Sequence, residues 1–132
     1  MRIYIAYKFS NVENKKGLQY GVQTVAELLE KRGHTTYVLG RDLQKWKDFT
    51  HPMHHKMRTI ISEIRKADLV FAYVNSDVFS KGLLYELTFA KLFGKRVIMA
   101  VKEGVKRPTL SFLANKVVRY ASEEDLDELG EI

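Results

Sequence analysis

The chain has 132 residues, of which 45% are hydrophobic and 29% are charged, and its formal net charge is +6. These values are typical of a soluble globular protein, and the length predicts a single domain over residues 1–132. Because the sequence has no cysteine, disulfides, thiolate metal ligands and cysteine nucleophiles are excluded. The positive charge favours anionic partners such as phosphorylated metabolites, nucleotides or nucleic acid.

Three features of the sequence indicate the cellular location of the protein. A strand pattern begins at residue 2, so we expect no signal peptide. No apolar run approaches the roughly 20 residues of a membrane span, so we expect no membrane partner. The absence of cysteine is compatible with a reducing compartment. Together these features favour a cytoplasmic location.

In the first half of the chain, a strand pattern is followed by a helix pattern and then by a second strand. The predicted elements are a strand at 3–7, a helix at 18–31 ended by Gly33, a strand at 35–39 closed by Gly40, and a polar stretch at 41–51. Pro52 suits the first turn of a further helix, in which Met57, Ile60, Ile61 and Ile64 share one face.

The second half of the chain continues the alternation. The predicted elements are a strand at 68–74, a helix at 82–93 ended by Gly94, a strand at 96–101, a short strand at 117–120 and an acidic helix at 123–129. The strands at 68–74 and 96–101 are almost continuously apolar, as expected when both faces of a sheet are covered.

Five strands alternating with helices predict an α/β fold of the flavodoxin-like or Rossmann-like kind. Right-handed crossovers then give a three-layer sandwich around a parallel sheet, with the strand order 2-1-3-4-5. Such sheets bind ligands beyond the carboxyl ends of the strands, where the strand order reverses. Here that point lies between the first and third strands, at segments 7–11 and 75–82.

Glu86 is the only charged side chain in the apolar run 82–90 at the start of the predicted helix. Desolvating an unpaired carboxylate is costly, so this residue needs either a buried partner or a chemical role. Its helix follows segment 75–82. Topology and this isolated acid therefore indicate the same crevice as a functional site.

Several motifs resemble the nucleoside 2-deoxyribosyltransferase superfamily, which includes 2'-deoxynucleoside 5'-monophosphate N-glycosidases. They are the Ala67-Asp68 pair opening an apolar strand, a loop with Asp77, the Gly82-Leu83-Leu84-Tyr85-Glu86 helix start, and Gly94-Lys95-Arg96-Val97. The resemblance implies an enzyme that cleaves or transfers at an N-glycosidic bond. Glu86 would attack the anomeric carbon and form a glycosyl ester, which water or an acceptor base would resolve.

The resemblance also implies roles for residues around Glu86. Tyr7 matches a polar position near the nucleophile, and Asp77 matches an acidic loop that contacts the sugar or assists the leaving base. The helix N-terminus would help keep Glu86 ionised. The residues expected to bind the nucleoside or nucleotide substrate are Lys8, Phe9, Ser10, Asn75, Ser76, Ser80 and Gly82. The implied chemistry needs no cofactor.

Two other functions fit parts of the sequence. A TIR-like signalling domain that cleaves or binds NAD-type nucleotides also places a glutamate on this helix, and nicotinamide release would distinguish it. A non-catalytic nucleotide- or nucleic-acid-binding module fits the charge. That module would need exposed aromatic residues interleaved with basic ones, which are not evident here. We therefore do not expect a nucleic acid partner.

The sequence also bears on metal binding and on oligomeric state. His51, His54 and His55 lie close in sequence, but no nearby acid completes a metal site, so we predict no metal. Members of the superfamily generally assemble as dimers or larger oligomers. The apolar excess around Glu86 predicts a homodimer through its helix. The residues of that excess are Phe79, Leu83, Leu84, Phe89 and Phe93.

Overall fold

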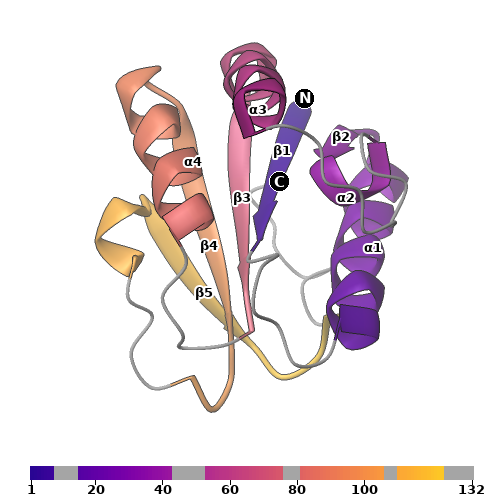
Figure 1. Cartoon of the computed structure of the whole chain (residues 1–132). Helices are drawn as coiled ribbons and strands as arrows, with labels where there is room; N and C mark the ends of the chain where they lie inside the picture. The colour runs from indigo at the N-terminus through magenta and orange to yellow at the C-terminus, as the bar shows by residue number, and fades with distance from the viewer. Residues whose placement is uncertain (8–14, 43–52, 76–80, 106–109, 124–132) are drawn as a thin grey trace.

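A computed structural model describes residues 1–7, 15–42, 53–75, 81–105 and 110–123 (Figure 1). The first elements are β1 (Arg2–Tyr7), α1 (Lys15–Lys31), β2 (Thr35–Val38), α2 (Leu39–Asp42) and α3 (Met53–Lys66). They are followed by β3 (Leu69–Val74), α4 (Lys81–Leu92), β4 (Arg96–Lys102), the 3-10 turn η1 (Ser111–Leu113) and β5 (Lys116–Tyr120).

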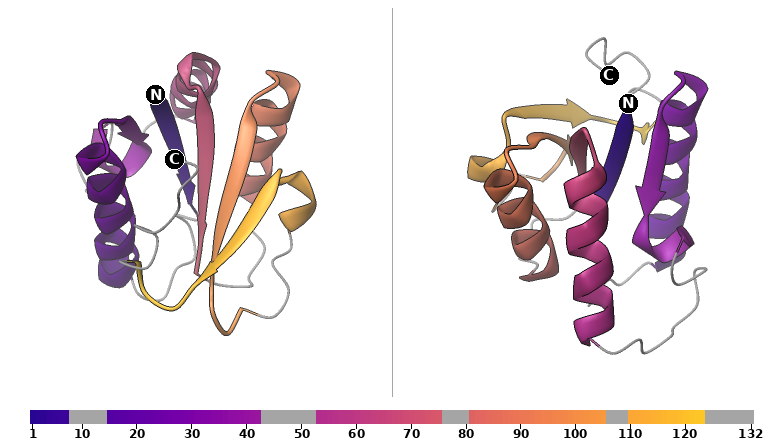
Figure 2. Two further views of the ribbon diagram at one scale, coloured as in Figure 1. Left: turned by 180° about the vertical axis from the view of Figure 1, so that it is seen from behind. Right: turned by 90° about the horizontal axis from the view of Figure 1, so that it is seen from above.

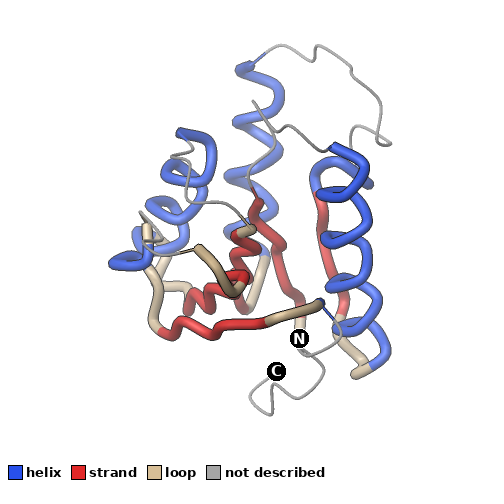
Figure 3. Tube along the Cα trace, turned by 90° about the horizontal axis from the view of Figure 1, so that it is seen from below, coloured by secondary structure: helices blue, strands red, loops and turns tan. Residues whose placement is uncertain are grey.

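The five strands form one parallel sheet in the order β2-β1-β3-β4-β5. Helix α1 covers one face of the sheet, and α3 and α4 cover the other (Figures 2 and 3). The predicted α/β class, three layers and strand order are therefore confirmed. The strand order reverses between β1 and β3, so the carboxyl ends of these two strands mark the expected site.

The core consists of two apolar clusters, one on each face of the sheet. Along β1, Ile3, Ile5 and Tyr7 belong to the cluster under α1. Tyr4 and Ala6 belong to the cluster under α3 and α4. This is the two-residue alternation of a strand, and it decides which tyrosine of β1 faces α4.

Helix α2 corrects the prediction for the end of β2. The sequence indicated a strand to residue 39 closed by Gly40, but β2 ends at Val38 and α2 begins at Leu39. The cause is that β2 is an edge strand whose outward polar groups need partners. Val38 N donates to Asp42 Oδ2 at 2.8 Å, and the Thr36 carbonyl accepts from Arg41 Nη2 at 2.9 Å.

The other predicted boundaries agree with the structure to within a few residues. Gly33 and Gly94 follow α1 and α4 with φ angles of 90° and 70°, a region that favours glycine. The turn η1 was not predicted. Of the predicted helix at 123–129, only Glu123 lies within the described residues. No helix in the described ranges is both long and apolar enough to cross a membrane.

The predicted homodimer through α4 stays a prediction. Leu83 is buried, and Leu84, Phe89 and Phe93 are partly buried against the same core, while Phe79 lies outside the described residues. Most of the apolar excess noted in the sequence therefore packs inside one chain.

Candidate functional site

Glu86 lies in the second turn of α4, on the helix face that meets the sheet. Its neighbours on that face are Leu83, Leu87 and Ala90, and all are buried. Residues three or four apart share one side of a helix, so the carboxyl group is carried into an apolar layer. Glu86 is only 9% exposed. A carboxyl group in that position needs a polar partner.

The partner is Tyr4 on β1. The Tyr4 hydroxyl donates a hydrogen bond of 2.5 Å to Glu86 Oε2. Tyr4 is itself fully buried, and its ring stacks on Tyr37 of β2 with centroids 5.8 Å apart. The stack and the surrounding core restrict the phenol ring, so the hydroxyl is held in a fixed direction toward the carboxyl group.

Burial dominates the electrostatics of this pair. It raises the pKa of Glu86 to about 8, while the hydrogen bond from Tyr4 acts in the opposite direction. Burial and the nearby carboxylate also raise the pKa of Tyr4 well above its usual value. At neutral pH Glu86 is therefore largely protonated. This effect of burial opposes the expectation that the helix N-terminus helps to keep Glu86 ionised.

Tyr7, which we had predicted as a site residue, lies at the carboxyl end of β1 and is 6% exposed. Its hydroxyl oxygen accepts a hydrogen bond of 2.9 Å from Gly40 N. Burial raises its pKa, and the carboxylates of Glu86 and Asp42 raise it further. Tyr7 is thus electrostatically coupled to Glu86, although its side chain packs with the α1 cluster.

The remaining predicted residues surround the start of α4 in the chain. Asn75 directly follows β3 and is partly buried, and Gly82 is exposed in the first turn of α4. The other predicted site residues lie outside the described residues, and their roles stay predictions. They are Lys8, Phe9, Ser10, Ser76, Asp77 and Ser80.

Sequence reasoning missed Tyr4, although a signal was present. Tyr4 and Tyr7 are three residues apart in one strand and therefore point to opposite faces. Only one of them can face α4, and the sequence alone did not show which. Knowing the face covered by α4 would have selected Tyr4.

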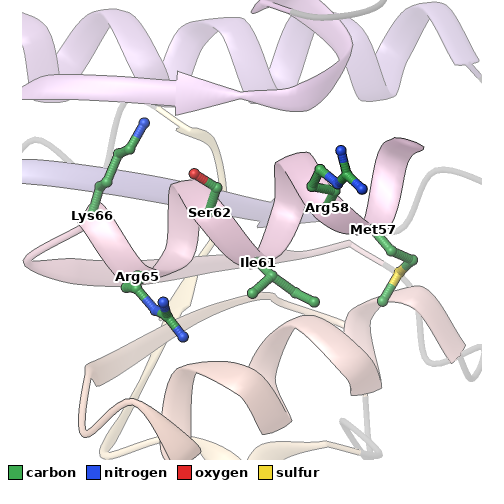
Figure 4. A pocket seen from close by; sticks show the side chains of 6 residues that line it. All are labelled: Met57, Arg58, Ile61, Ser62, Arg65 and Lys66. Carbon is green, nitrogen blue, oxygen red and sulfur yellow. The ribbon is translucent and has the colours of Figure 1, made fainter. Parts of the chain in front are cut away.

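Pockets are also found in the described part of the chain away from Glu86. One pocket lies on α3, lined by Met57, Arg58, Ile61, Ser62, Arg65 and Lys66 (Figure 4). Another lies beside β2, lined by Glu30, His34, Thr35, Thr36 and Arg41. Glu86 lines neither. Within the described ranges, no three His, Asp or Glu side chains gather as metal ligands, and the side chains of His51, His54 and His55 lie outside the description.

The fold of this chain is similar to that of several solved structures. No family model and no curated protein matches the chain. Among solved structures, the CMP N-glycosidase BcmB of Clostridium botulinum superimposes with a TM-score of 0.70 at 18% identity, covering 99% of this chain and 98% of its own. The 2-deoxyribosyltransferase of Bacillus psychrosaccharolyticus gives 0.69 at 18% identity, with 97% and 91% covered. The solution structure of BlsM gives 0.72 at 20% identity, with 96% and 84% covered.

At these identities the likeness shows a shared fold over almost the whole chain. The resemblance found in the motifs is therefore confirmed at the level of the fold. Its implications for chemistry rest on the Tyr4–Glu86 pair.

Proposed function

We propose that this protein cleaves or transfers at the N-glycosidic bond of a nucleoside or nucleotide, with Glu86 as the nucleophile. The observation that carries the proposal is the buried hydrogen bond between Tyr4 and Glu86. It joins β1 to α4 close to the point where the strand order reverses. The fold supports the proposal, because it is shared with a CMP N-glycosidase and a 2-deoxyribosyltransferase.

The proposed chemistry assigns different tasks to the two carboxyl oxygens. Tyr4 binds Oε2 and orients the group, so Oε1 attacks the anomeric carbon. The bond from carbon to the base nitrogen breaks, and its electron pair leaves with the base. The resulting glycosyl ester is resolved by water, which completes hydrolysis, or by a second base, which completes transfer. Asp77 is the proposed contact to the sugar or leaving base.

Glu86 must lose its proton before it can attack. Its raised pKa makes the carboxylate scarce at neutral pH, but a desolvated carboxylate is also a stronger base and nucleophile. The hydrogen bond from Tyr4 stabilises the ionised form. The net charge of +6 attracts anions, so we favour nucleoside monophosphates over uncharged nucleosides as the proposed substrate.

The direct test is release of free base from a panel of deoxynucleosides and nucleoside monophosphates, followed by chromatography. NAD in the same panel, with nicotinamide as product, tests the TIR-like alternative. We expect Glu86→Gln to lower the rate by about 10³-fold or more, since it removes the nucleophile. The matched control is Glu27→Gln, an exposed glutamate of α1. Base release that is undiminished in Glu86→Gln would contradict the assigned role.

A further inference from the structure

Helices α3 and α4 pack against each other on one face of the sheet, so their outward sides lie next to each other (Figure 2). Helix α3 buries Ile64 against the core and exposes Arg58, Arg65 and Lys66 on its outward side. Ser62 lies among these cations, and all four polar residues line the pocket on this helix (Figure 4). The α3 part of the outward surface is therefore cationic.

The positive charge of α3 is poorly compensated. Within the described part of the chain, neither Arg58 nor Arg65 has a carboxylate partner. The acid that α3 itself carries, Glu63, is bound by Arg2 at 2.7 Å, and only 14% of its side chain is exposed. Lys66 reaches that glutamate at 3.8 Å. A partner for this surface should therefore be anionic.

Helix α4 is apolar on its outward side as well as on the side that meets the sheet. Tyr85 and Leu92 are 53% and 72% exposed. With Lys81 and Thr88 they follow the spacing of three or four residues that marks one side of a helix, opposite to the buried side. A surface helix normally directs polar and charged residues to solvent. The outward side of α4 therefore exposes apolar area that a partner could cover.

More exposed apolar side chains lie beside α4. Phe112 is 75% exposed in η1, which packs against α4. Val117 of β5 is 42% exposed and faces the same side of the sheet as its register partner Met99, which belongs to the cluster under α3 and α4. Helix α1, on the other face, exposes Tyr20 and charged residues of both signs.

Four of the six large hydrophobic residues that are exposed in the described ranges thus lie on the side of α3 and α4. Uncompensated cations and exposed apolar side chains coincide there. We refer to this side as the α3–α4 surface, which is centred on Arg58, Arg65, Lys66, Tyr85, Leu92 and Phe112.

The occupant of the α3–α4 surface must be anionic and must also cover apolar side chains. A second copy that brought the same surface in a two-fold dimer would supply, from its described residues, no exposed acid for the cations. Nucleic acid supplies phosphates, but its bases stack on aromatic rings, and Leu92 and Val117 have none. An anionic lipid surface meets both demands, because its headgroups attract lysine and arginine while leucine and phenylalanine enter the boundary with the acyl chains.

We propose that the α3–α4 surface binds an anionic lipid bilayer from one side. Arg58, Arg65 and Lys66 contact the lipid phosphates, and the exposed apolar side chains of α4 and η1 enter the boundary between headgroups and acyl chains. Such binding needs no spanning helix, so the lack of a long apolar run does not bear on it. It is independent of the chemistry at Glu86, which lies on the buried side of α4.

The first experiment measures sedimentation of the full chain with vesicles. We expect binding to vesicles of phosphatidylcholine and phosphatidylserine in equal parts, and much weaker binding to phosphatidylcholine alone. Arg58→Gln/Lys66→Gln should lower the partition coefficient by about tenfold or more, because each cation close to an anionic surface contributes roughly fivefold.

The matched control is Lys16→Gln/Lys31→Gln, which removes the same charge from exposed positions of α1. These positions lie about 20 Å from the α3–α4 surface across two packed layers, beyond a Debye length of about 10 Å, so we expect less than about a twofold effect. No binding to the anionic vesicles, or equal effects of the two double variants, would overturn the proposal. Binding to a short single-stranded RNA without binding to vesicles would assign the cations to nucleic acid and would overturn it as well.

The second experiment tests the apolar contact and uses the absence of cysteine, which allows labelling at one site. A polarity-sensitive fluorophore on Leu92→Cys should shift its emission to shorter wavelength when the anionic vesicles are added. The same fluorophore on Tyr20→Cys of α1, where the native side chain is 62% exposed, should not shift. A fluorophore at position 92 that stays in water with vesicles, or that another copy of the chain already shields without them, would contradict the lipid contact.

Discussion

At the scale of single residues, the raised pKa of Glu86 sets the pH at which the proposed enzyme works. The nucleophile must be ionised, and the ionised fraction rises about tenfold per pH unit until the pKa near 8. We therefore expect kcat/KM, which reports the free enzyme, to rise with pH from 6 and level off above about 8. A profile that is flat or falls over this range would contradict a nucleophilic carboxylate with this pKa.

Tyr4→Phe tests the hydrogen bond that favours the ionised form. Bonds to charged groups contribute about 1.5–3 kcal/mol, equivalent to one or two pKa units. We expect the midpoint of the pH–rate profile to move upward by that amount, so that activity lost at pH 7 returns in part at high pH. Tyr37→Phe keeps the stacked ring near Tyr4 and is the control. Equal midpoints in both variants would show that the Tyr4 hydroxyl does not tune Glu86.

Glu86 could be selected from the sequence because a lone acid within an apolar helix start is physically conspicuous. Tyr4 could not be selected, because its partner lies 82 positions away and its orientation depends on the face that α4 covers. The raised pKa of Glu86 also escaped sequence reasoning. The dipole of a helix can be inferred from the sequence, whereas the depth of burial depends on the packing of β1 against α4.

At the scale of elements, the contact between α1 and β3 depends on Gly21. A Cβ at this position would overlap the Tyr73 hydroxyl oxygen and lie 2.8 Å from Cζ of the same ring. Replacing a helical glycine by alanine normally stabilises a helix by about 1 kcal/mol. Here the overlap should cost about 1–3 kcal/mol and outweigh that gain.

We therefore expect Gly21→Ala to lower the free energy of unfolding in urea. Tyr73→Phe in the same background should restore part of the loss, because it removes the overlapping oxygen. The two substitutions should consequently be non-additive in a double-mutant cycle. A Gly21→Ala variant more stable than the unmodified protein would show that the helix and sheet separate easily at this contact.

Helix α2 shows why element boundaries are harder to predict than elements. The strand pattern at 35–39 and the glycine at 40 placed the end of β2 one residue too late, because β2 ends at Val38. The helical turn that follows is fixed by Arg41 and Asp42, which bind the outward polar groups of β2, and Arg41 also binds Glu30 of α1 at 2.8 Å. These contacts depend on β2 being an edge strand, which is a property of the assembled sheet.

At the scale of the whole molecule, the strand order and layers follow from alternation and from the handedness of crossovers. Both are local properties of the chain, so the fold could be predicted without the structure. The candidate site depends on contacts between distant elements, so the sequence indicated Glu86, an isolated acid in an apolar run, but not its partner Tyr4.

The buried carboxyl group also affects the stability of the whole domain. Burial raises the pKa of Glu86 from its ordinary value of 4.5 to about 8 in the folded protein, so its contribution to stability is fully present below about pH 4.5. That contribution is lost as pH rises through 8, by roughly 3 kcal/mol between pH 5 and pH 7.5.

Glu86→Gln removes this titration while keeping an acceptor for Tyr4. We expect its free energy of unfolding, relative to the unmodified protein, to increase by roughly 3 kcal/mol from pH 5 to pH 7.5 in urea titrations. Glu27→Gln at an exposed position should show no such trend. A constant difference between Glu86→Gln and the unmodified protein across this range would mean that the carboxyl group titrates alike in both states.

Residues of α2 bind two of the outward backbone groups of β2, and this limits how other chains can attach to that edge. Thr36 and Val38 direct a carbonyl and an amide outward, and Arg41 and Asp42 already occupy both. An extended peptide arriving at that side would find those two groups taken and could not use them for β-augmentation. Recognition along this border should therefore rely more on side chains, and the addition of further strands from this side is hindered by the chain's own next turn.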